Sequence, residues 1–187
     1  MSKKRISILF TLLFLIFLGI LDYPFVSQLL NDIDQSEVAL SHELAEADLT
    51  QEERDRMRAE AVAYNKVLAE ASNTHLLTPY EDAKTQDDWY LNLLNIRGDG
   101  IMGAVEIPKI EINIPIYHGT TNEVLKKGAG HLEGSSLPVG GKNTHTIISA
   151  HRGIPDKRFF TDLDQIKEDD IFLIKILGET MAYKVYS

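Results

Sequence analysis

The chain begins with three basic residues followed by an apolar run, and this pattern determines in which environment its first helix can lie. Lys3, Lys4 and Arg5 precede an uncharged, strongly apolar stretch over residues 6–21. At about 1.5 Å per residue this stretch makes a helix of roughly 24 Å, shorter than the ~30 Å hydrocarbon core of a bilayer. Residues 23–26 extend the apolar surface and add aromatic rings suited to the membrane interface. The sequence therefore predicts a transmembrane anchor over residues 6–26, embedded in the lipid bilayer.

The basic flank predicts the topology of this anchor, with residues 1–5 cytoplasmic and the remainder of the chain outside the cell membrane. A cleaved signal peptide is the competing interpretation, and it requires small residues at an Ala-x-Ala-like site. The residues after the run, Leu21-Asp22-Tyr23, are bulky. We therefore favour a retained single-pass anchor.

Composition excludes several classes of function. The 187 residues carry a net charge of −9, and no basic stripe is visible, so no nucleic-acid partner is expected. The sequence contains no cysteine, which excludes disulfides and cysteine-ligated metal sites.

Residues 27–72 are predicted to form a helical region. Between residues 31 and 72 there is no Gly or Pro, and Thr50 with Glu53 forms a capping box, so a helix is expected to begin near residue 51. A shorter helix is expected over about 35–47, and both helices are expected to be acidic on their outer face. Residues 73–97 contain Pro79 and polar residues, and we interpret them as a lid-like loop.

From residue 98 the pattern changes to β-structure. Isoleucines alternate with other residues over 110–116, and the flanking Pro108 and the internal Pro115 suggest strand ends or a sheet edge. Residues 144–150 predict a more buried strand, and residues 156–166 a short helix. Residues 171–177 and 180–186 predict a hairpin with a type II′ turn at Gly178-Glu179.

His151 stands where the apolar strand 144–150 runs into a loop with Gly and Pro, a place where a scaffold can hold a side chain at a cleft edge. An imidazole there can act as a general acid or base near neutral pH. His145 shares its parity along the extended segment, so both rings could face one side. No His-Glu-x-x-His spacing occurs, and we expect neither a metal nor a cofactor. Ser135 in the Gly-rich loop lacks a nucleophile elbow and is interpreted as a turn residue.

Six segments in order carry a resemblance to a known family. They are GDGIMG (98–103), EIPKI (106–110), PIYHGT (115–120), GHLEGSSLPVGG (130–141), AHRGIP (150–155) and FFTDL (159–163). Together they resemble the class C sortases, the pilus-assembling enzymes of Gram-positive bacteria. The resemblance implies a mainly β fold, a closed sortase-type β-barrel, preceded here by N-terminal helices and one transmembrane helix.

The resemblance also implies an activity. A cysteine thiolate attacks a Leu-Pro-x-Thr-Gly-like sorting signal of a pilin or surface protein between Thr and Gly. A pilin lysine amine then resolves the acyl-enzyme into an isopeptide bond. The resemblance makes His151 the catalytic histidine, which protonates the leaving amine.

Two departures from the family pattern stand out. The family's cysteine and arginine follow the histidine on later strands, and Arg152 and Arg158 do not occupy the arginine's motif position. We therefore expect residues 98–187 to be the N-terminal part of a truncated, incomplete barrel that is inactive alone. The family lid carries Asp-Pro-aromatic, and here Thr78, Pro79 and Tyr80 correspond to it, with Thr in place of Asp.

The alternative interpretation is a non-catalytic, degenerate sortase that acts as a cell-surface binding module. The absence of cysteine motivates it.

Overall fold

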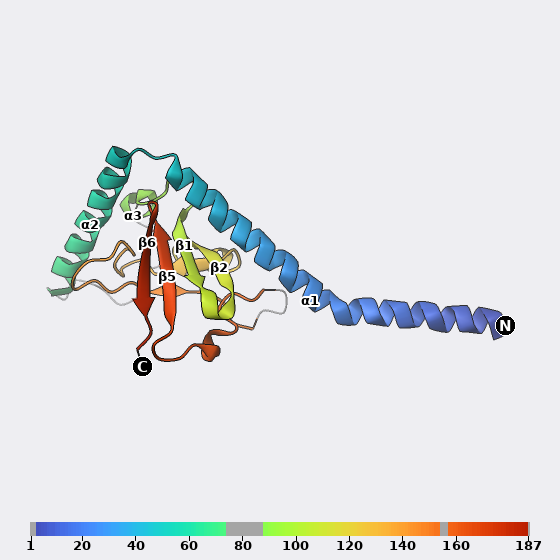
Figure 1. Cartoon of the computed structure of the whole chain (residues 1–187). Helices are drawn as coiled ribbons and strands as arrows, with labels where there is room; N and C mark the ends of the chain where they lie inside the picture. The colour runs from blue at the N-terminus through green and yellow to red at the C-terminus, as the bar shows by residue number, and fades with distance from the viewer. Residues whose placement is uncertain (1–2, 74–87, 154–156, 187) are drawn as a thin grey trace.

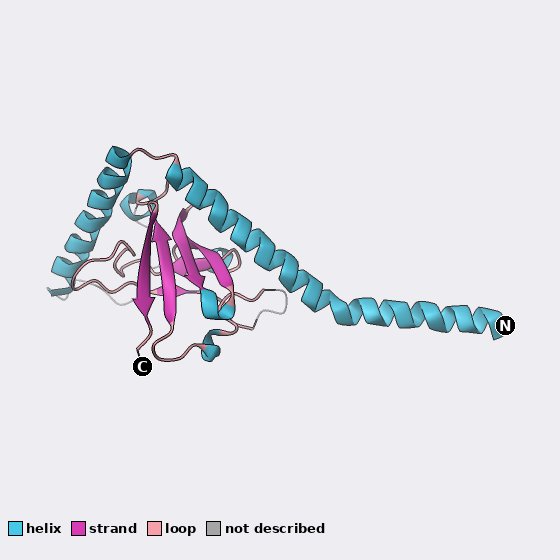
Figure 2. Cartoon of the chain, viewed as in Figure 1, coloured by secondary structure: helices cyan, strands magenta, loops and turns pink. Residues whose placement is uncertain are grey.

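The computed structural model describes residues 3–73, 88–153 and 157–186. A long helix, α1 (Lys3–Ala47), projects from a domain in which a second helix, α2 (Gln51–Asn73), and a short helix, α3 (Asp88–Asn92), lie beside a β-sheet (Figure 1, Figure 2). The predicted lid residues Thr78, Pro79 and Tyr80 lie outside the described residues.

Helix α1 spans Lys3–Ala47 without interruption. The predicted membrane segment and the helix predicted over 35–47 are therefore parts of one helix; the predicted end at residue 47 is confirmed, and the predicted start near residue 35 is wrong. The physical reason is that residues 25–47 contain no Gly or Pro to stop the helix. Pro24 lies inside α1, and the helix changes direction partway along (Figure 1), as a missing N–H and a clash with the preceding turn require.

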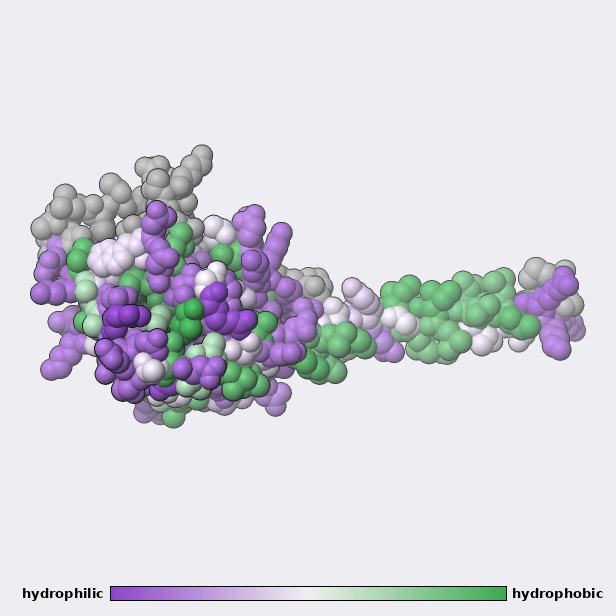
Figure 3. Space-filling model, turned by 90° about the horizontal axis from the view of Figure 1, so that it is seen from above, coloured by the Kyte–Doolittle hydropathy of each residue, from purple (hydrophilic) through white to green (hydrophobic). Residues whose placement is uncertain are grey.

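The N-terminal part of α1 has the properties of a membrane span. Its most apolar 18-residue window has a mean hydropathy of 2.4, and no part of that window is buried against the domain. The C-terminal part of α1 instead packs on strands β1 (Ile101–Ile107), β2 (Ile112–His118) and β5 (Ile171–Ile176), and it buries Ala39, His42 and Glu46. One helix therefore joins an apolar rod to the domain (Figure 3).

Helix α2 spans Gln51–Asn73, so the predicted start near residue 51 is confirmed. The Thr50 N–H donates to Glu53 Oε2 at 2.9 Å, and the Glu53 N–H donates to Thr50 Oγ1 at 3.3 Å, which is the predicted capping box. Ala61 and Tyr64 on one face of α2 are buried in the core. Helix α3, Asp88–Asn92, corrects the prediction of a loop over 73–97, because its Tyr90 is fully buried and gives this short segment a core contact.

Six strands form one sheet in the order β4-β3-β2-β1-β5-β6. Their bounds are β1 Ile101–Ile107, β2 Ile112–His118, β3 Ala129–His131, β4 Ile148–Ser149, β5 Ile171–Ile176 and β6 Glu179–Lys184. Strands β2 and β3 are parallel and the other neighbours are antiparallel. The curled sheet with an apolar N-terminal helix confirms the predicted fold class, and β4 and β6 form the edges of the sheet.

Two sheet predictions need correction. Pro115 lies within β2, between β1 and β3, and is not at an edge; β3 pairs with β2 only from Ile116 onward, so the proline precedes that ladder. The strand predicted over 144–150 shrinks to Ile148–Ser149, and none of its residues is fully buried, because it is an edge strand beside the three-residue β3.

The predicted helix over residues 156–166 is also wrong in extent. Among the described residues of this segment, only Leu163–Gln165 is helical, as the 3-10 turn η2. A second 3-10 turn, η1, spans Pro108–Ile110 between β1 and β2, and short helix α4 spans Asn122–Leu125 before β3.

The β5–β6 hairpin turns at Leu177 and Gly178, which have φ of 53° and 74°. Positive φ at both positions defines a type I′ turn, not the predicted type II′ turn one residue later. The cause lies on α1: the buried Glu46 carboxylate accepts the Leu177 N–H at 2.7 Å and the Gly178 N–H at 3.0 Å. His42 lies beside this carboxylate, with Nε2 3.4 Å from Oε1.

Candidate active site

His151 follows edge strand β4, at the start of a loop that contacts residues 160–164. Its side chain is half-buried, and its carbonyl accepts the Phe160 N–H at 3.2 Å. The next residue, Arg152, forms an ion pair with Asp164 at 3.1 Å. The loop that carries the histidine is therefore tied to residues 160–164, and the ring stands at the end of the sheet.

A cavity of about 630 Å³ opens on the face of the sheet next to β4. Its walls are mostly apolar, and they come from β1, β4, β5, β6 and the segment around η2. The side chains that line it are Val105, Ile107, Pro138, Thr144, His145, Thr146, Ile148, Phe160, Leu163, Ile166, Phe172, Ile174, Tyr183, Val185 and Tyr186. An apolar groove with few polar groups is suited to an extended peptide or to further β-structure. We call these residues the sheet groove.

The sheet groove includes His145 but not His151, which lies three residues beyond the lining residue Ile148. The two histidines with shared parity therefore do not line this cavity together. In the described part of the chain, no three His, Asp or Glu side chains are grouped so that they could hold a metal ion.

A buried polar cluster that the sequence did not reveal surrounds His131 of β3. Tyr90 of α3 places its hydroxyl 3.0 Å from His131 Nδ1, and the same oxygen accepts the Gly119 N–H at 2.9 Å. His131 Nε2 lies 2.9 Å from the Ser136 carbonyl and 3.1 Å from Ser135 Oγ. Because a carbonyl can only accept, Nε2 carries the hydrogen and Nδ1 is an acceptor. The Tyr90 hydroxyl, which has one hydrogen, lies 3.0 Å from both Nδ1 and the His131 carbonyl.

This arrangement makes Ser135 a structural residue. A serine nucleophile needs an unprotonated histidine nitrogen to take its proton, and here the nitrogen that faces Ser135 is the donor. The Ser135 hydroxyl itself donates to the Leu132 carbonyl at 2.7 Å and accepts the Ile147 N–H at 3.1 Å. The turn-forming interpretation of Ser135 is confirmed, since its own N–H also bonds to Leu132.

Burial sets the protonation of this cluster. It lowers the pKa of His131 to about 4, although the bond to the Ser136 carbonyl opposes that shift. Burial also raises the pKa of the Tyr90 hydroxyl far above its ordinary value. The cluster is therefore neutral near pH 7. Its role is to hold the surrounding backbone by hydrogen bonds and not to transfer protons.

His118 at the end of β2 occupies a different environment in the same region. Its Nδ1 lies 2.9 Å from the Gly100 carbonyl, and its Nε2 lies 2.7 Å from the Leu93 carbonyl. Burial lowers the pKa of His118, while the two carbonyls favour the charged ring and limit the shift. The ring ties the segment after α3 to the start of β1.

Neither arginine near His151 is free to polarise a substrate carbonyl. Arg152 pairs with Asp164, as described above. Arg158 donates to the Ile110 carbonyl at 2.9 Å and pairs with Asp162 at 3.3 Å and with Asp32 of α1 at 3.7 Å. Arg158 thus fastens the loop behind His151 to the long helix.

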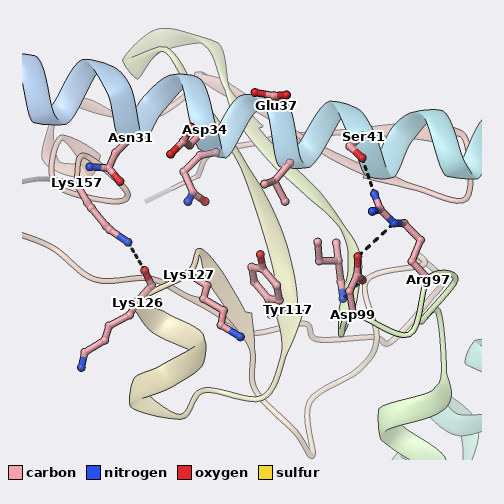
Figure 4. A pocket seen from close by; sticks show the side chains of 13 residues that line it. Asn31, Asp34, Glu37, Ser41, Arg97, Asp99, Tyr117, Lys126, Lys127 and Lys157 are labelled. Carbon is pink, nitrogen blue, oxygen red and sulfur yellow. Dashed lines mark hydrogen bonds and ion pairs between the residues drawn. The ribbon is translucent and has the colours of Figure 1, made fainter.

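A second cavity, of about 680 Å³, lies between α1 and strand β2. Figure 4 shows Asp34 on the helix side and Lys126 and Lys127 on the opposite side, with Tyr117 between them. Arg97 at its end bonds to the Ser41 hydroxyl and pairs with Asp99 (Figure 4). This cavity is polar and lies apart from His151, so we assign it no part in the chemistry.

Comparison with known proteins identifies the fold. Residues 105–187 match the sortase domain family. The chain is 37% identical over 51 residues to sortase A of Streptococcus agalactiae and 36% identical over 77 residues to sortase D of Bacillus subtilis. These alignments cover 27% and 41% of this chain, and 20% and 36% of the two relatives, so this chain spans well under half of either one.

Solved structures match over a larger share of the chain. Sortase C1 of Streptococcus agalactiae has a TM-score of 0.69 and 37% identity, over 81% of this chain and 76% of that one. Sortase C of Streptococcus pneumoniae has a TM-score of 0.68 and 38% identity, over 81% and 74%. Sortase C of Clostridium perfringens, solved with the C-terminal cell wall sorting motif, has a TM-score of 0.65 and 38% identity, over 81% and 75%.

The curled sheet with a histidine at the end of an edge strand is thus a sortase-type fold. The chain belongs to the sortase family, and the solved structures it matches here are sortases C.

Proposed function

We propose that this chain is the membrane-anchored, histidine-bearing part of a class C sortase. The reaction proposed is cleavage of a Leu-Pro-x-Thr-Gly-like sorting signal followed by transfer of the acyl group to a pilin lysine. A thiolate adds to the Thr carbonyl, the Thr–Gly bond breaks, and the Gly nitrogen leaves as an amine. The lysine amine then displaces the thiolate and forms the isopeptide bond.

His151 is the residue to which we assign acid–base work in this reaction. Its ring donates a proton to the departing Gly nitrogen and takes one from the incoming lysine amine. The position beyond β4, beside the sheet groove, supports the proposal, because a peptide lying in that groove would run past the end of β4.

The thiolate cannot come from this sequence, which contains no cysteine. We therefore expect the 187 residues by themselves to form no acyl intermediate. In the proposed enzyme the cysteine and the carbonyl-polarising arginine come from strands that follow the histidine, as in the family pattern.

The observation that carries the proposal is the combination of a loop-borne histidine with 37% identity to sortase C1 over 76% of that structure. A complementation experiment tests it. The chain is fused through its C-terminus to the cysteine- and arginine-bearing strands of the Streptococcus agalactiae sortase C1 and incubated with a Leu-Pro-x-Thr-Gly peptide. We expect an acyl-enzyme adduct by mass spectrometry, and its loss in His151→Ala.

The matched control is Lys142→Ala, because this exposed residue lies nine residues upstream on the same segment and does not line the sheet groove. It should retain most of the adduct. A fusion that gives the far-ultraviolet and Trp89 fluorescence spectra of a folded protein, yet forms equal adduct with and without His151, would contradict the assignment.

We also propose that Thr78, Pro79 and Tyr80 form the lid segment of this site, by resemblance to the family. Threonine in place of aspartate removes the carboxylate that would pair with the catalytic arginine. In the fusion enzyme, Thr78→Asp is therefore expected to slow peptide cleavage, and Thr78→Asn, which has a similar size but no charge, is expected not to.

For the cellular location, we propose that α1 holds the domain outside the cell membrane with residues 1–5 in the cytoplasm. The apolar window of α1 and its tribasic flank support this topology. Labelling of intact cells tests it: a cysteine introduced at Glu60 should react with a membrane-impermeant maleimide, and one introduced at Ser2 should not.

The absence of cysteine favours a second candidate, a binding module for sorting signals. The sheet groove would hold the apolar Leu-Pro part of the peptide without chemistry. Titration of the unfused chain with a labelled Leu-Pro-x-Thr-Gly peptide distinguishes the candidates. Saturable binding that Ile148→Glu abolishes supports a module, whereas binding only by the fused enzyme supports the catalytic proposal.

A further inference from the structure

The part of α1 that follows the proline bend has an apolar stripe on the side away from the domain. Six side chains make up this outer stripe, and each exposes between 53% and 62% of its area: Val26, Leu29, Leu30, Ile33, Leu40 and Leu44. Polar or charged residues fill most positions between them. Over residues 35–47 the exposed face of α1 combines Leu40 and Leu44 with Glu37, so the prediction of an acidic outer face is only partly right for this helix.

The opposite face of the same helix is already occupied by the domain. Ala39, His42 and Glu46 are at most 1% exposed, and Lys175 of β5 pairs with Glu43 at 2.9 Å. At 100° per residue, Ile33 and His42 lie about 180° apart around the helix axis. The outer stripe is thus no part of the domain core, and the helix carries a second, separate apolar surface.

The spacing of the outer stripe is that of a coiled coil. Val26, Leu30, Ile33, Leu40 and Leu44 occupy positions separated alternately by four and three residues, with Glu37 in the one remaining position of the series. A 3.5-residue repeat makes the stripe self-complementary along the helix axis. We propose that the outer stripe is the interface of a parallel homodimer, in which α1 of one chain packs against α1 of a second copy.

Membrane insertion favours a second copy over other occupants. This inference goes beyond the proposed function but relies on its anchor: two chains inserted with the same topology present their α1 helices parallel and in register. Confinement to one bilayer also raises their effective concentration.

Lipid cannot cover the whole outer stripe, so it is a less suitable occupant than a second copy of the chain. Leu40 and Leu44 follow the end of the apolar segment at residue 26 by a rise of roughly 20 to 27 Å along the helix. That distance carries them beyond the headgroup layer of an upright helix.

The available area is sufficient for such a dimer. A Leu, Ile or Val side chain that is more than half exposed has roughly 100 Å² still to bury. Six of them on each chain give about 1,200 Å² over both copies, the lower end of the range for specific protein interfaces. The apolar rod that continues the helix toward the N-terminus extends the possible contact further (Figure 3).

Glu37 distinguishes this specific dimer from non-specific hydrophobic association. It is exposed, and it is also one of the residues that line the cavity between α1 and β2 (Figure 4). In a parallel pair, two Glu37 carboxylates would face each other at the centre of the stripe, so they would weaken the dimer and fix its register. The proposal therefore predicts a reversible dimer that a single substitution strengthens.

The absence of cysteine makes cross-linking unambiguous. The full chain carrying Leu40→Cys, reconstituted in phosphatidylcholine–phosphatidylglycerol vesicles, is treated with a short bis-maleimide. The matched control is Asp34→Cys, which lies near the same height above the membrane but on another exposed face of α1. We expect at least fivefold more covalent dimer from Leu40→Cys, a return to the control level when Ile33→Glu is added, and at least tenfold tighter association with Glu37→Leu.

Equal cross-linking from the two cysteines would overturn the proposal. Quenching of a fluorophore on the position-40 cysteine by a lipid-borne quencher would also overturn it, because the stripe would then lie on the bilayer. Failure of the chain to float with the vesicles would refute the anchor and with it the reason for a parallel pair. Trp89 fluorescence identical to that of the parent chain establishes that each variant retains its domain.

Discussion

Acid should destabilise the domain through His131, and the size of the effect follows from its burial. The ring is 0% exposed, and burial lowers its pKa from 6.5 to about 4. In the unfolded chain the same histidine takes up a proton near pH 6.5, whereas in the folded protein it stays neutral until about pH 4. The stabilisation is therefore complete above pH 6.5 and is lost progressively as the pH falls toward 4.

The magnitude comes from the shift of about 2.5 pH units at 1.36 kcal/mol each, which is about 3 kcal/mol between pH 7 and pH 4. This is a large part of the stability of a domain of this size. The assay is urea unfolding of the full chain in mild detergent micelles, followed by the fluorescence of Trp89, the one tryptophan in the sequence. Trp89 is a suitable reporter because its ring packs edge-on against Tyr64 at 5.1 Å.

Carboxylates that become protonated over the same pH range also lower the stability of the folded state. The measured quantity is therefore the difference in stability loss between the parent chain and a variant. His131→Gln keeps one acceptor for Tyr90 and one donor for the Ser136 carbonyl but does not titrate. It should be less stable at pH 7 and should lose about 3 kcal/mol less than the parent on acidification. The exposed His145→Gln serves as the control and should follow the parent. The reasoning is refuted if His131→Gln loses as much stability as the parent does.

Three further substitutions test the packing of the same structure by urea unfolding at pH 7. Glu46→Ala leaves the buried Leu177 N–H and the partly buried Gly178 N–H without their acceptor and should cost about 2–4 kcal/mol; an unchanged midpoint would mean that water replaces the carboxylate. Gly103→Ala places a methyl group 2.4 Å from the Lys175 carbonyl oxygen and should cost about 1–3 kcal/mol, with a weakened β1–β5 ladder visible by amide exchange. Asn65→Ala removes both hydrogen bonds from α2 to the backbone of residue 137 and should cost about 2–3 kcal/mol; a cost below 0.5 kcal/mol would show that this clamp is dispensable.

The sequence predicts features that depend on local pattern. The start of α2 is one of these, because the Thr50–Glu53 box satisfies its first N–H groups wherever the helix packs. The strands β5 and β6 are another, because their hydrophobic residues and the nearby glycine define a hairpin. The position of His151 after an extended segment follows from the same kind of reading.

Features that depend on distant partners were not predictable in this way. The hairpin turn shifted by one residue because Glu46, 131 positions upstream of Leu177, accepts its N–H groups. Tyr90 and His131 meet although 41 residues separate them, so no spacing rule marks the pair. Helix α3 forms within a polar stretch because burial of Tyr90 outweighs the local preference for a loop.

The long-range contacts of α1 also connect this helix to the candidate site. Glu46 fixes the β5–β6 turn, and β5 and β6 form one wall of the sheet groove. Asp32, farther toward the N-terminus of α1, holds Arg158 in the loop behind His151. Because the same helix carries both attachments, the groove and the histidine loop are both fixed to the part of α1 that follows Pro24. Under the proposed anchoring, a substrate delivered from the membrane would meet the groove at a height set by this part of α1.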